Sequence, residues 1–195
     1  MAHLQKRGWQ QDTDIIFTSD HGELQGDYGL LFKGPYHVNA LMRLPLIWKP
    51  SPRLNISPAE VSEPVGHLDL AQTFCHIAGI DEPHWVEGNK LPISNEEARA
   101  QQRSHVITEW DSEHGPVDIH LKSIFQDGWL CTAYEKSSLY EGTEGELYDL
   151  KEDPDQLINL WSDQSMQSIK SDLIADLKDK LPPVRQPRLE RKAPV

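Results

Sequence analysis

The first half of the chain contains two short apolar runs that are typical of buried strands. In the first, Asp14 to Thr18, the apolar residues are consecutive rather than alternating with polar ones. A continuous run of this kind is expected of a central parallel strand that is covered on both faces. The second run, Leu44 to Trp48, is expected to re-enter the same sheet. The pattern therefore predicts an α/β sheet in this half of the chain.

The second half of the chain has a different pattern, with strand-like runs that follow one another closely. Asp127 and Gly128 form a two-residue turn signal between two of these runs, which predicts a β-hairpin. We expect a small antiparallel sheet here, built from His105 to Trp110, Leu121 to Gln126, Trp129 to Tyr134 and Glu146 to Leu150.

Two helices are predicted from apolar residues at helical spacing. The first has Leu70, Phe74, Ile77 and Ala78 on one face, with Asp69 as N-cap and Gly79 as its stop. His67 is expected to be a structural partner of that cap. The second runs from Gln164 to Lys180 and ends before two prolines, with an apolar stripe of Met166, Ile169, Leu173 and Leu177.

Composition and charge exclude several classes of protein. The 195 residues carry 31 acidic and 19 basic side chains and a net charge of −12, which argues against a nucleic-acid partner. No apolar run approaches the length of a membrane span, so no membrane partner is expected. The two cysteines are expected to be free thiols. The compartment and the oligomeric state stay open.

The strongest candidate chemistry follows the first apolar run, at Asp20 and His21. Ligands of open α/β sheets bind beyond the carboxyl ends of the strands. Neighbouring side chains of a strand point to opposite faces, so these two can share an ion only where the chain leaves β geometry, and Gly22 makes that turn easy. Carboxylate with imidazole suits Mn, Mg, Fe or Zn, whereas Ca prefers oxygen ligands. The alternative is an ordinary polar turn.

A lysine and a histidine follow in a loop built on glycine and proline, Lys33 to His37. This loop is expected to bring Lys33 toward the metal. An ammonium beside a divalent cation repels it unless an anion lies between the two. This arrangement favours a small-molecule anionic ester, a sulfate or phosphate ester, as the substrate.

At this point the sequence resembles the C-terminal part of a sulfatase of the alkaline phosphatase superfamily, in the branch of arylsulfatases and phosphonate monoester hydrolases. The matching blocks follow the family's order over most of the chain: Ile15 to Gly22, Lys33 to Ile47, Gly66 to Gly79 and Gly145 to Leu160.

The resemblance implies roles for four residues. Asp20 and His21 complete the shell of a divalent metal ion (Ca, Mn or Mg), Lys33 contacts the anionic oxygens of the ester, and His37 binds substrate or protonates the leaving group. Many sulfatases carry Asn where His21 stands, and the His variant is typical of phosphonate and some sulfate ester hydrolases, which leaves the preferred anion open.

The chain also departs from the family's pattern. Sulfatases oxidise the cysteine of a Cys/Ser-x-Pro-x-Arg motif to the formylglycine nucleophile and take further metal-binding aspartates from their N-terminal part. Neither Cys75 nor Cys131 opens such a motif. We therefore expect a sulfatase-like hydrolase fragment that is inactive alone. Hydrolysis of phosphonate or phosphate esters, and a non-catalytic remnant with a packing or assembly role, are the alternatives.

The fold class expected from pattern and resemblance is α/β: the C-terminal portion of an alkaline-phosphatase-like sheet domain, followed by an antiparallel-sheet-plus-helix subdomain. The predicted parts are a remnant of the catalytic domain (1–81), a connecting segment (82–104), the C-terminal subdomain (105–182) and a Pro/Arg-rich tail (183–195).

Overall fold

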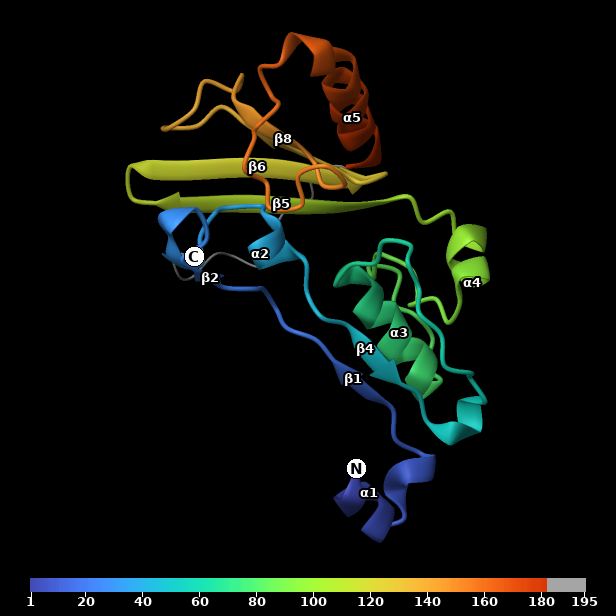
Figure 1. The fold of residues 1–195 in the computed structure, drawn as a ribbon. Helices are drawn as coiled ribbons and strands as arrows, with labels where there is room; N and C mark the ends of the chain where they lie inside the picture. Colours follow the sequence, from blue (N-terminus) through green and yellow to red (C-terminus); the bar gives the residue numbers. More distant parts are fainter. Residues whose placement is uncertain (182–195) are drawn as a thin grey trace. The chain divides into compact units, whose positions relative to one another are not determined.

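The computed structural model describes residues 1–181, so the predicted tail lies outside the described residues. The chain forms two compact units (Figure 1). The first consists of Met1–Gly22 and Arg43–Ser104, and the second of Glu23–Met42 together with the chain from His105 onward. Residues 23–42, which the sequence analysis places in the first predicted part, thus belong to the second unit.

The first unit contains a two-stranded ribbon and several helices. Strands β1 and β4 pair antiparallel, with Ile16 opposite Trp48 and Phe17 opposite Ile47. The expected parallel partner of β1 does not occur within residues 1–181. An apolar run indicates burial on both faces, but it does not specify the direction of the neighbouring strand. The elements of this unit are α1 (Ala2–Lys6), η1 (Trp9–Gln11), β1 (Ile15–Phe17), β4 (Ile47–Lys49), η3 (Pro52–Leu54), α3 (Leu68–Ala78) and α4 (Asn95–Ala100).

Helix α3 ends at Gly79 as predicted, but Asp69 is not its N-cap. His67 occupies the N-cap position, and Asp69 lies buried in the first turn. The Asp69 carboxylate accepts hydrogen bonds from the backbone N–H groups of Gly66 and Asn89 and pairs with Arg103 at 2.7 Å. This buried ion pair ties α3 to two loops.

Helix α4 lies within the segment that the sequence analysis interprets as a connection. The Ser94 side chain accepts a hydrogen bond from the Glu97 backbone N–H, and the Glu97 carboxylate accepts one from Ile93. A serine followed three residues later by glutamate is a helix-start signal that identifies this element from sequence.

The second unit is built on a four-stranded antiparallel sheet with strand order β5-β6-β7-β8. Asp127 and Gly128 connect β6 to β7 with positive φ angles of 54° and 89°, as the hairpin signal predicts. The sheet strands are β5 (His105–His114), β6 (Val117–Gln126), β7 (Trp129–Tyr134) and β8 (Gly145–Asp149). The other elements are β2 (Leu24–Gln25), η2 (Asp27–Gly29), β3 (Leu31–Phe32), α2 (Asn39–Met42), η4 (Gln164–Met166) and α5 (Gln167–Lys180).

The two faces of this sheet are covered by different segments. Ile124, Cys131 and Leu147 are neighbours across the strands and pack against Leu173 and Leu177 of α5, which lies on that face (Figure 1). The opposite face carries a row of polar residues, Ser123, Thr132 and Glu146, between buried apolar ones that include Leu121 and Leu130. The 23–42 segment contacts this face through the hydrogen bond between His37 and Ser123.

The β5–β6 hairpin is longer than predicted. The predicted strands end at Trp110 and begin again at Leu121, whereas the ladder continues to the pair His114 and Val117. The added residues are largely polar because this extension is partly solvated, which removes the apolar pattern by which strands are found. None of the helices in residues 1–181 combines the length and apolar content that a membrane-crossing helix requires.

Candidate functional site

Asp20 and His21 lie in a tight turn directly after β1, and their side chains converge. Asp20 Oδ2 and His21 Nε2 are 3.5 Å apart. Ser19 organises the turn, because its hydroxyl donates hydrogen bonds to the His21 carbonyl at 2.8 Å and to Asp20 Oδ1 at 3.3 Å. The chain has left β geometry here, so two consecutive side chains face a common point.

The hydrogen bonds around this turn leave Asp20 and His21 each with one atom that can donate a lone pair to a cation. The backbone N–H of His21 donates to Asp20 Oδ1, which is the main reason that the pKa of Asp20 is lowered and its carboxylate stays ionised. The Nδ1 atom of His21 lies 2.8 Å from the carbonyl oxygen of Gly22. Because a carbonyl only accepts, Nδ1 carries the proton, and in neutral imidazole Nε2 then holds a lone pair toward Asp20. Either a proton or a metal cation can bridge two such atoms.

His67 supports the same turn, a contact that the sequence does not reveal. Its Nε2 lies 2.8 Å from the backbone carbonyl oxygen of Ser19, the residue before Asp20. From sequence, His67 is predicted to be a partner of the α3 cap. The structure places it at the start of α3, hydrogen-bonded to a residue 48 positions away, and no local pattern encodes such a contact.

Asp20 and His21 are not joined by further metal-ligand side chains among the described residues. Within residues 1–181, no group of three or more His, Cys, Asp and Glu side chains is arranged to hold a metal ion. Cys131 is fully buried, and burial raises the pKa of its thiol to about 12. Since the thiolate is the nucleophilic form, this cysteine is unreactive at neutral pH.

Lys33 lies in the second unit, just after a strained residue. Phe32 has a φ of 69°, a conformation that residues with bulky side chains rarely adopt, so the backbone turns sharply before the lysine. A Cβ at Gly34 would lie 2.8 Å from the Tyr36 ring, so a larger residue there would force this ring to shift. Lys33 itself is exposed. This loop therefore holds an ammonium group in solvent on a closely specified backbone.

His37 is buried in the second unit, with only 2% of its surface exposed. Its Nδ1 lies 2.6 Å from the Ser123 hydroxyl, which in turn is 2.7 Å from the hydroxyl of Thr132. Burial lowers the pKa of His37 to about 4. At neutral pH this imidazole is uncharged and anchors the loop to the sheet, which does not favour the predicted role as a proton donor.

The structure thus brings together two of the four candidate residues, Asp20 and His21, in one turn. Lys33 and His37 belong to the other unit, on one loop. A site that contains all four residues stays a prediction.

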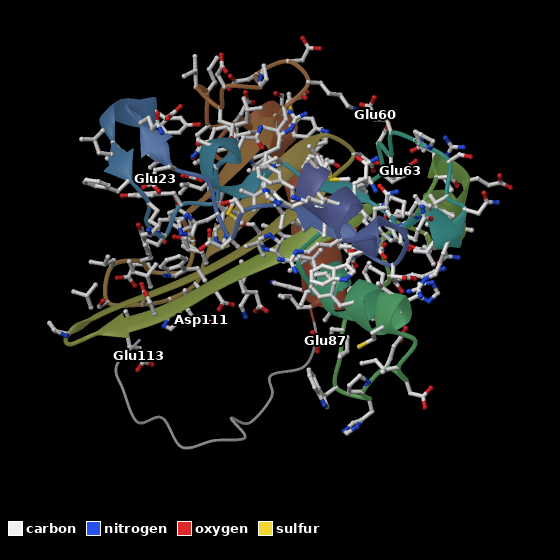
Figure 2. All side chains as sticks on the ribbon, turned by 90° about the horizontal axis from the view of Figure 1, so that it is seen from below. Glu23, Glu60, Glu63, Glu87, Asp111 and Glu113 are labelled. Atoms are coloured by element: carbon white, nitrogen blue, oxygen red, sulfur yellow. The ribbon has the colours of Figure 1, made fainter. Side chains whose placement is uncertain are left out.

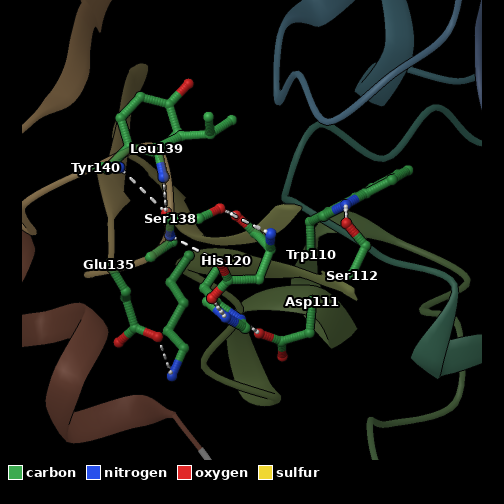
Figure 3. A network of polar contacts seen from close by, with 11 residues as sticks. Trp110, Asp111, Ser112, His120, Glu135, Ser138, Leu139 and Tyr140 are labelled. Atoms are coloured by element: carbon green, nitrogen blue, oxygen red, sulfur yellow. Dashed lines mark hydrogen bonds and ion pairs between the residues drawn. The ribbon is translucent and has the colours of Figure 1, made fainter. Parts of the chain in front are cut away.

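A further polar cluster lies on the β5–β6 hairpin (Figure 3). The His120 ring is 2.7 Å from Asp111 and 3.1 Å from Asp118, and the hydrogen bond to Asp111 is the main reason that its pKa is raised. The backbone N–H of Ser138 donates to Asp118. Asp111 projects from β5 beside Glu113 (Figure 2). Both ring nitrogens are occupied by carboxylates of the same hairpin, so the cluster joins the two strands to a neighbouring loop.

Comparison with known proteins gives the family. Residues 26–182 match the family described as N-sulphoglucosamine sulphohydrolase, C-terminal. The chain belongs to this sulfatase family. It is 30% identical over 179 residues to the uncharacterized sulfatase YidJ of Escherichia coli, a match that covers 91% of this chain and 34% of YidJ. It is 29% identical over 179 residues to the multifunctional alkaline phosphatase superfamily protein PehA of Trinickia caryophylli, covering 88% of this chain and 34% of PehA.

Solved structures agree with the family. A putative sulfatase from Bacteroides thetaiotaomicron matches with a TM-score of 0.69 and 27% identity, covering 87% of this chain and 36% of that one. The phosphonate monoester hydrolase of Agrobacterium radiobacter matches in fold, with a TM-score of 0.77 and 22% identity over 91% of this chain and 36% of that one. The predicted family and α/β fold class are confirmed, and the chain spans about a third of the length of the curated relatives it matches.

Proposed function

We propose that this chain is the C-terminal part of a metal-dependent sulfuric ester hydrolase. The observation that carries the proposal is the turn after β1, where Asp20 Oδ2 and His21 Nε2 lie 3.5 Å apart in a sulfatase-family chain. Their oxygen and nitrogen donors fit a divalent ion such as Mn or Mg. Such an ion, when bound, polarises the ester and stabilises the attacking nucleophile.

In this proposal the chain's own residues bind and orient the ester. Asp20 stays ionised because backbone hydrogen bonds lower its pKa, so it is available as a ligand at neutral pH. Lys33 neutralises the anionic oxygens of the substrate. His37 does not touch the ester and instead fixes the Lys33 loop through its bond to Ser123. The nucleophile and the remaining ligands come from a part of the enzyme that the relatives have outside the matched region.

The isolated chain is therefore expected to be inactive. Two ligands and a lysine, without a nucleophile, do not complete covalent ester hydrolysis. Steady-state assays of the purified chain with nitrophenyl sulfate and nitrophenyl phenylphosphonate are expected to show no turnover above buffer. Turnover by the chain alone would mean that the chemistry lies elsewhere.

The positive test uses a chimera. The arylsulfatase of Clostridium perfringens is 30% identical to this chain over 160 residues, and the chain is to replace that region of the enzyme. We expect the chimera to hydrolyse the sulfate ester, and Asp20→Asn, His21→Ala and Lys33→Ala to lower kcat/KM at least about 100-fold, a loss typical of groups that stabilise developing charge. Lys178→Ala, at an exposed lysine of α5, is the matched control.

The same assay separates the alternatives. If the chimera prefers the phosphonate ester, the chain belongs to a phosphonate or phosphate ester hydrolase, for which His21 is the variant expected from the sequence. If the chimera folds but the Asp20 and Lys33 variants retain full activity, the turn is not part of the site. A folded, inactive chimera supports the non-catalytic alternative.

A further inference from the structure

His67 joins the start of α3 to the turn that follows β1. It is the residue directly before the helix, and its Nε2 atom lies 2.8 Å from the backbone carbonyl oxygen of Ser19. A carbonyl oxygen only accepts hydrogen bonds, so Nε2 carries the proton and donates it. Both residues belong to the first unit, so the contact lies within one compact part of the chain.

The residue that His67 contacts also determines how the two candidate ligands lie. The carbonyl group of Ser19 and the backbone N–H of Asp20 belong to one rigid peptide plane, so fixing that carbonyl fixes the backbone that leads into Asp20. The Ser19 hydroxyl donates to the His21 carbonyl at 2.8 Å. The separation of 3.5 Å between Asp20 Oδ2 and His21 Nε2 therefore depends on the orientation of Ser19.

The backbone of His67 is itself held firmly by the first turn of α3. The Gly66 N–H donates to Asp69 Oδ2 at 2.9 Å, and Asp69 forms the buried ion pair with Arg103. The Leu70 N–H donates to the His67 carbonyl at 3.1 Å. Within residues 1–181 the His67 side chain makes no capping hydrogen bond to α3, and it occupies an exposed position. Removing the imidazole should therefore disturb the turn more than the helix.

We propose that His67 is a positioning residue of the metal site, whose hydrogen bond to the Ser19 carbonyl holds the Asp20 carboxylate and the His21 imidazole toward one common point. The proposal rests on the proposed function, because a bound divalent ion gives that common point its consequence for catalysis. His67 acts through Ser19 and binds neither the ion nor the ester. Groups that orient metal ligands in this way typically change metal affinity or activity about 10–100-fold when they are removed.

The first test is NMR spectroscopy of the full chain without metal. Two signals of His21 report the geometry of the turn: its backbone N–H, which donates to Asp20, and its ring Nδ1, which faces the Gly22 carbonyl. We expect His67→Ala to speed the exchange of that amide about fivefold, the factor that one hydrogen bond typically contributes, and to shift the ring nitrogen signals. His67→Gln keeps a side-chain N–H donor and is expected to restore both. His76→Ala, at an exposed position of the same helix, is the matched control.

The second test measures the consequence for function in the arylsulfatase chimera, after removal of bound metal with a chelator. We expect His67→Ala to raise the Mn²⁺ concentration that gives half-maximal activity at least about tenfold, and His67→Gln to stay within about threefold of the unmodified chimera. A purely structural role would lower yield or thermal stability and leave the Mn²⁺ dependence as it is.

The outcomes separate this proposal from the proposed function. Unchanged His21 signals in His67→Ala, or a loss that His67→Gln does not restore, overturn the proposal. So does an unchanged Mn²⁺ dependence of the His67→Ala chimera, and if Asp20→Asn still abolishes activity, the proposed function stands. Full activity of the Asp20→Asn chimera refutes both, so the two failures differ in this variant. Because the NMR measurement uses the chain alone, it decides the proposal even where the chimera does not fold.

Discussion

Removing one partner of the buried ion pair in the first unit is expected to destabilise that unit strongly, and Arg103→Met tests this. The Arg103 and Asp69 side chains are only 6% and 8% exposed. Besides the ion pair, Arg103 donates to the backbone carbonyl oxygens of Asn89 and Lys90. Methionine keeps the stem but leaves Asp69 with the two backbone N–H donors from Gly66 and Asn89. Removing one partner of a buried pair strands the other charge, so we expect a loss of about 3–5 kcal/mol.

This loss is large enough to measure directly. With a urea dependence of about 2 kcal/mol per molar, the unfolding midpoint falls by roughly 1.5–2.5 M. Amide hydrogen exchange in α3 measures the effect locally, because opening free energies differ between parts of a structure. Arg53→Met is the matched control, since Arg53 pairs with Asp12 at 3.3 Å in solvent, where such pairs contribute at most about 1 kcal/mol.

A double-mutant cycle completes the test. Adding Asp69→Asn to Arg103→Met removes the stranded charge, so the double variant is expected to lose less than the sum of the single losses. Strict additivity, or an Arg103→Met loss no larger than that of Arg53→Met, would refute the reasoning that burial gives this pair its weight.

Three more predictions concern the second unit. Leu147→Ala empties a fully buried position and is expected to cost about 2–5 kcal/mol in urea unfolding, whereas Leu157→Ala at an exposed position should change stability by less than about 0.5 kcal/mol. Gly34→Ala puts a Cβ 2.8 Å from the Tyr36 ring, so we expect a lower melting temperature that Tyr36→Ala restores; an unchanged one contradicts the contact. Burial lowers the pKa of His37 to about 4, so protonation favours the unfolded chain as pH falls from about 6.5 to 4. We expect this to lower the free energy of unfolding by roughly 3 kcal/mol in urea titrations, and His37→Gln to abolish the loss. Parallel pH profiles of the two proteins would contradict this prediction.

Local patterns were sufficient for the β6–β7 hairpin and for helix α5 of the second unit. The Asp127-Gly128 turn and the strand-like runs on either side of it specify the hairpin, and the stripe of Leu173 and Leu177 specifies the buried face of α5. The Asp20–His21 turn was also accessible, because both residues and the Gly22 carbonyl that orients the ring are consecutive. In each case the decisive contacts are close in sequence.

Contacts between distant residues were not accessible in the same way. His37 meets Ser123 across 86 positions, so no local pattern in the sequence indicates that its ring is buried. Arg103 reaches Asp69 across 34 positions, and nothing near either residue announces the pair. The direction of the strand beside β1 was not predictable either, since hydrophobicity indicates burial but not how strands pair. Helix α4 could have been predicted, because Ser94 and Glu97 form a helix-start signal in the sequence.

The second unit is assembled from two pieces of chain with about 60 residues of the first unit between them. Residues 23–42 are synthesised well before β5 to β8. The segment that covers the Ser123 face of the sheet is therefore already present when the sheet forms. A shortened gene that starts at His105 would keep the apolar layer under α5 but leave Ser123 without its imidazole partner. Expression of this region by itself therefore calls for the early segment to be supplied as well.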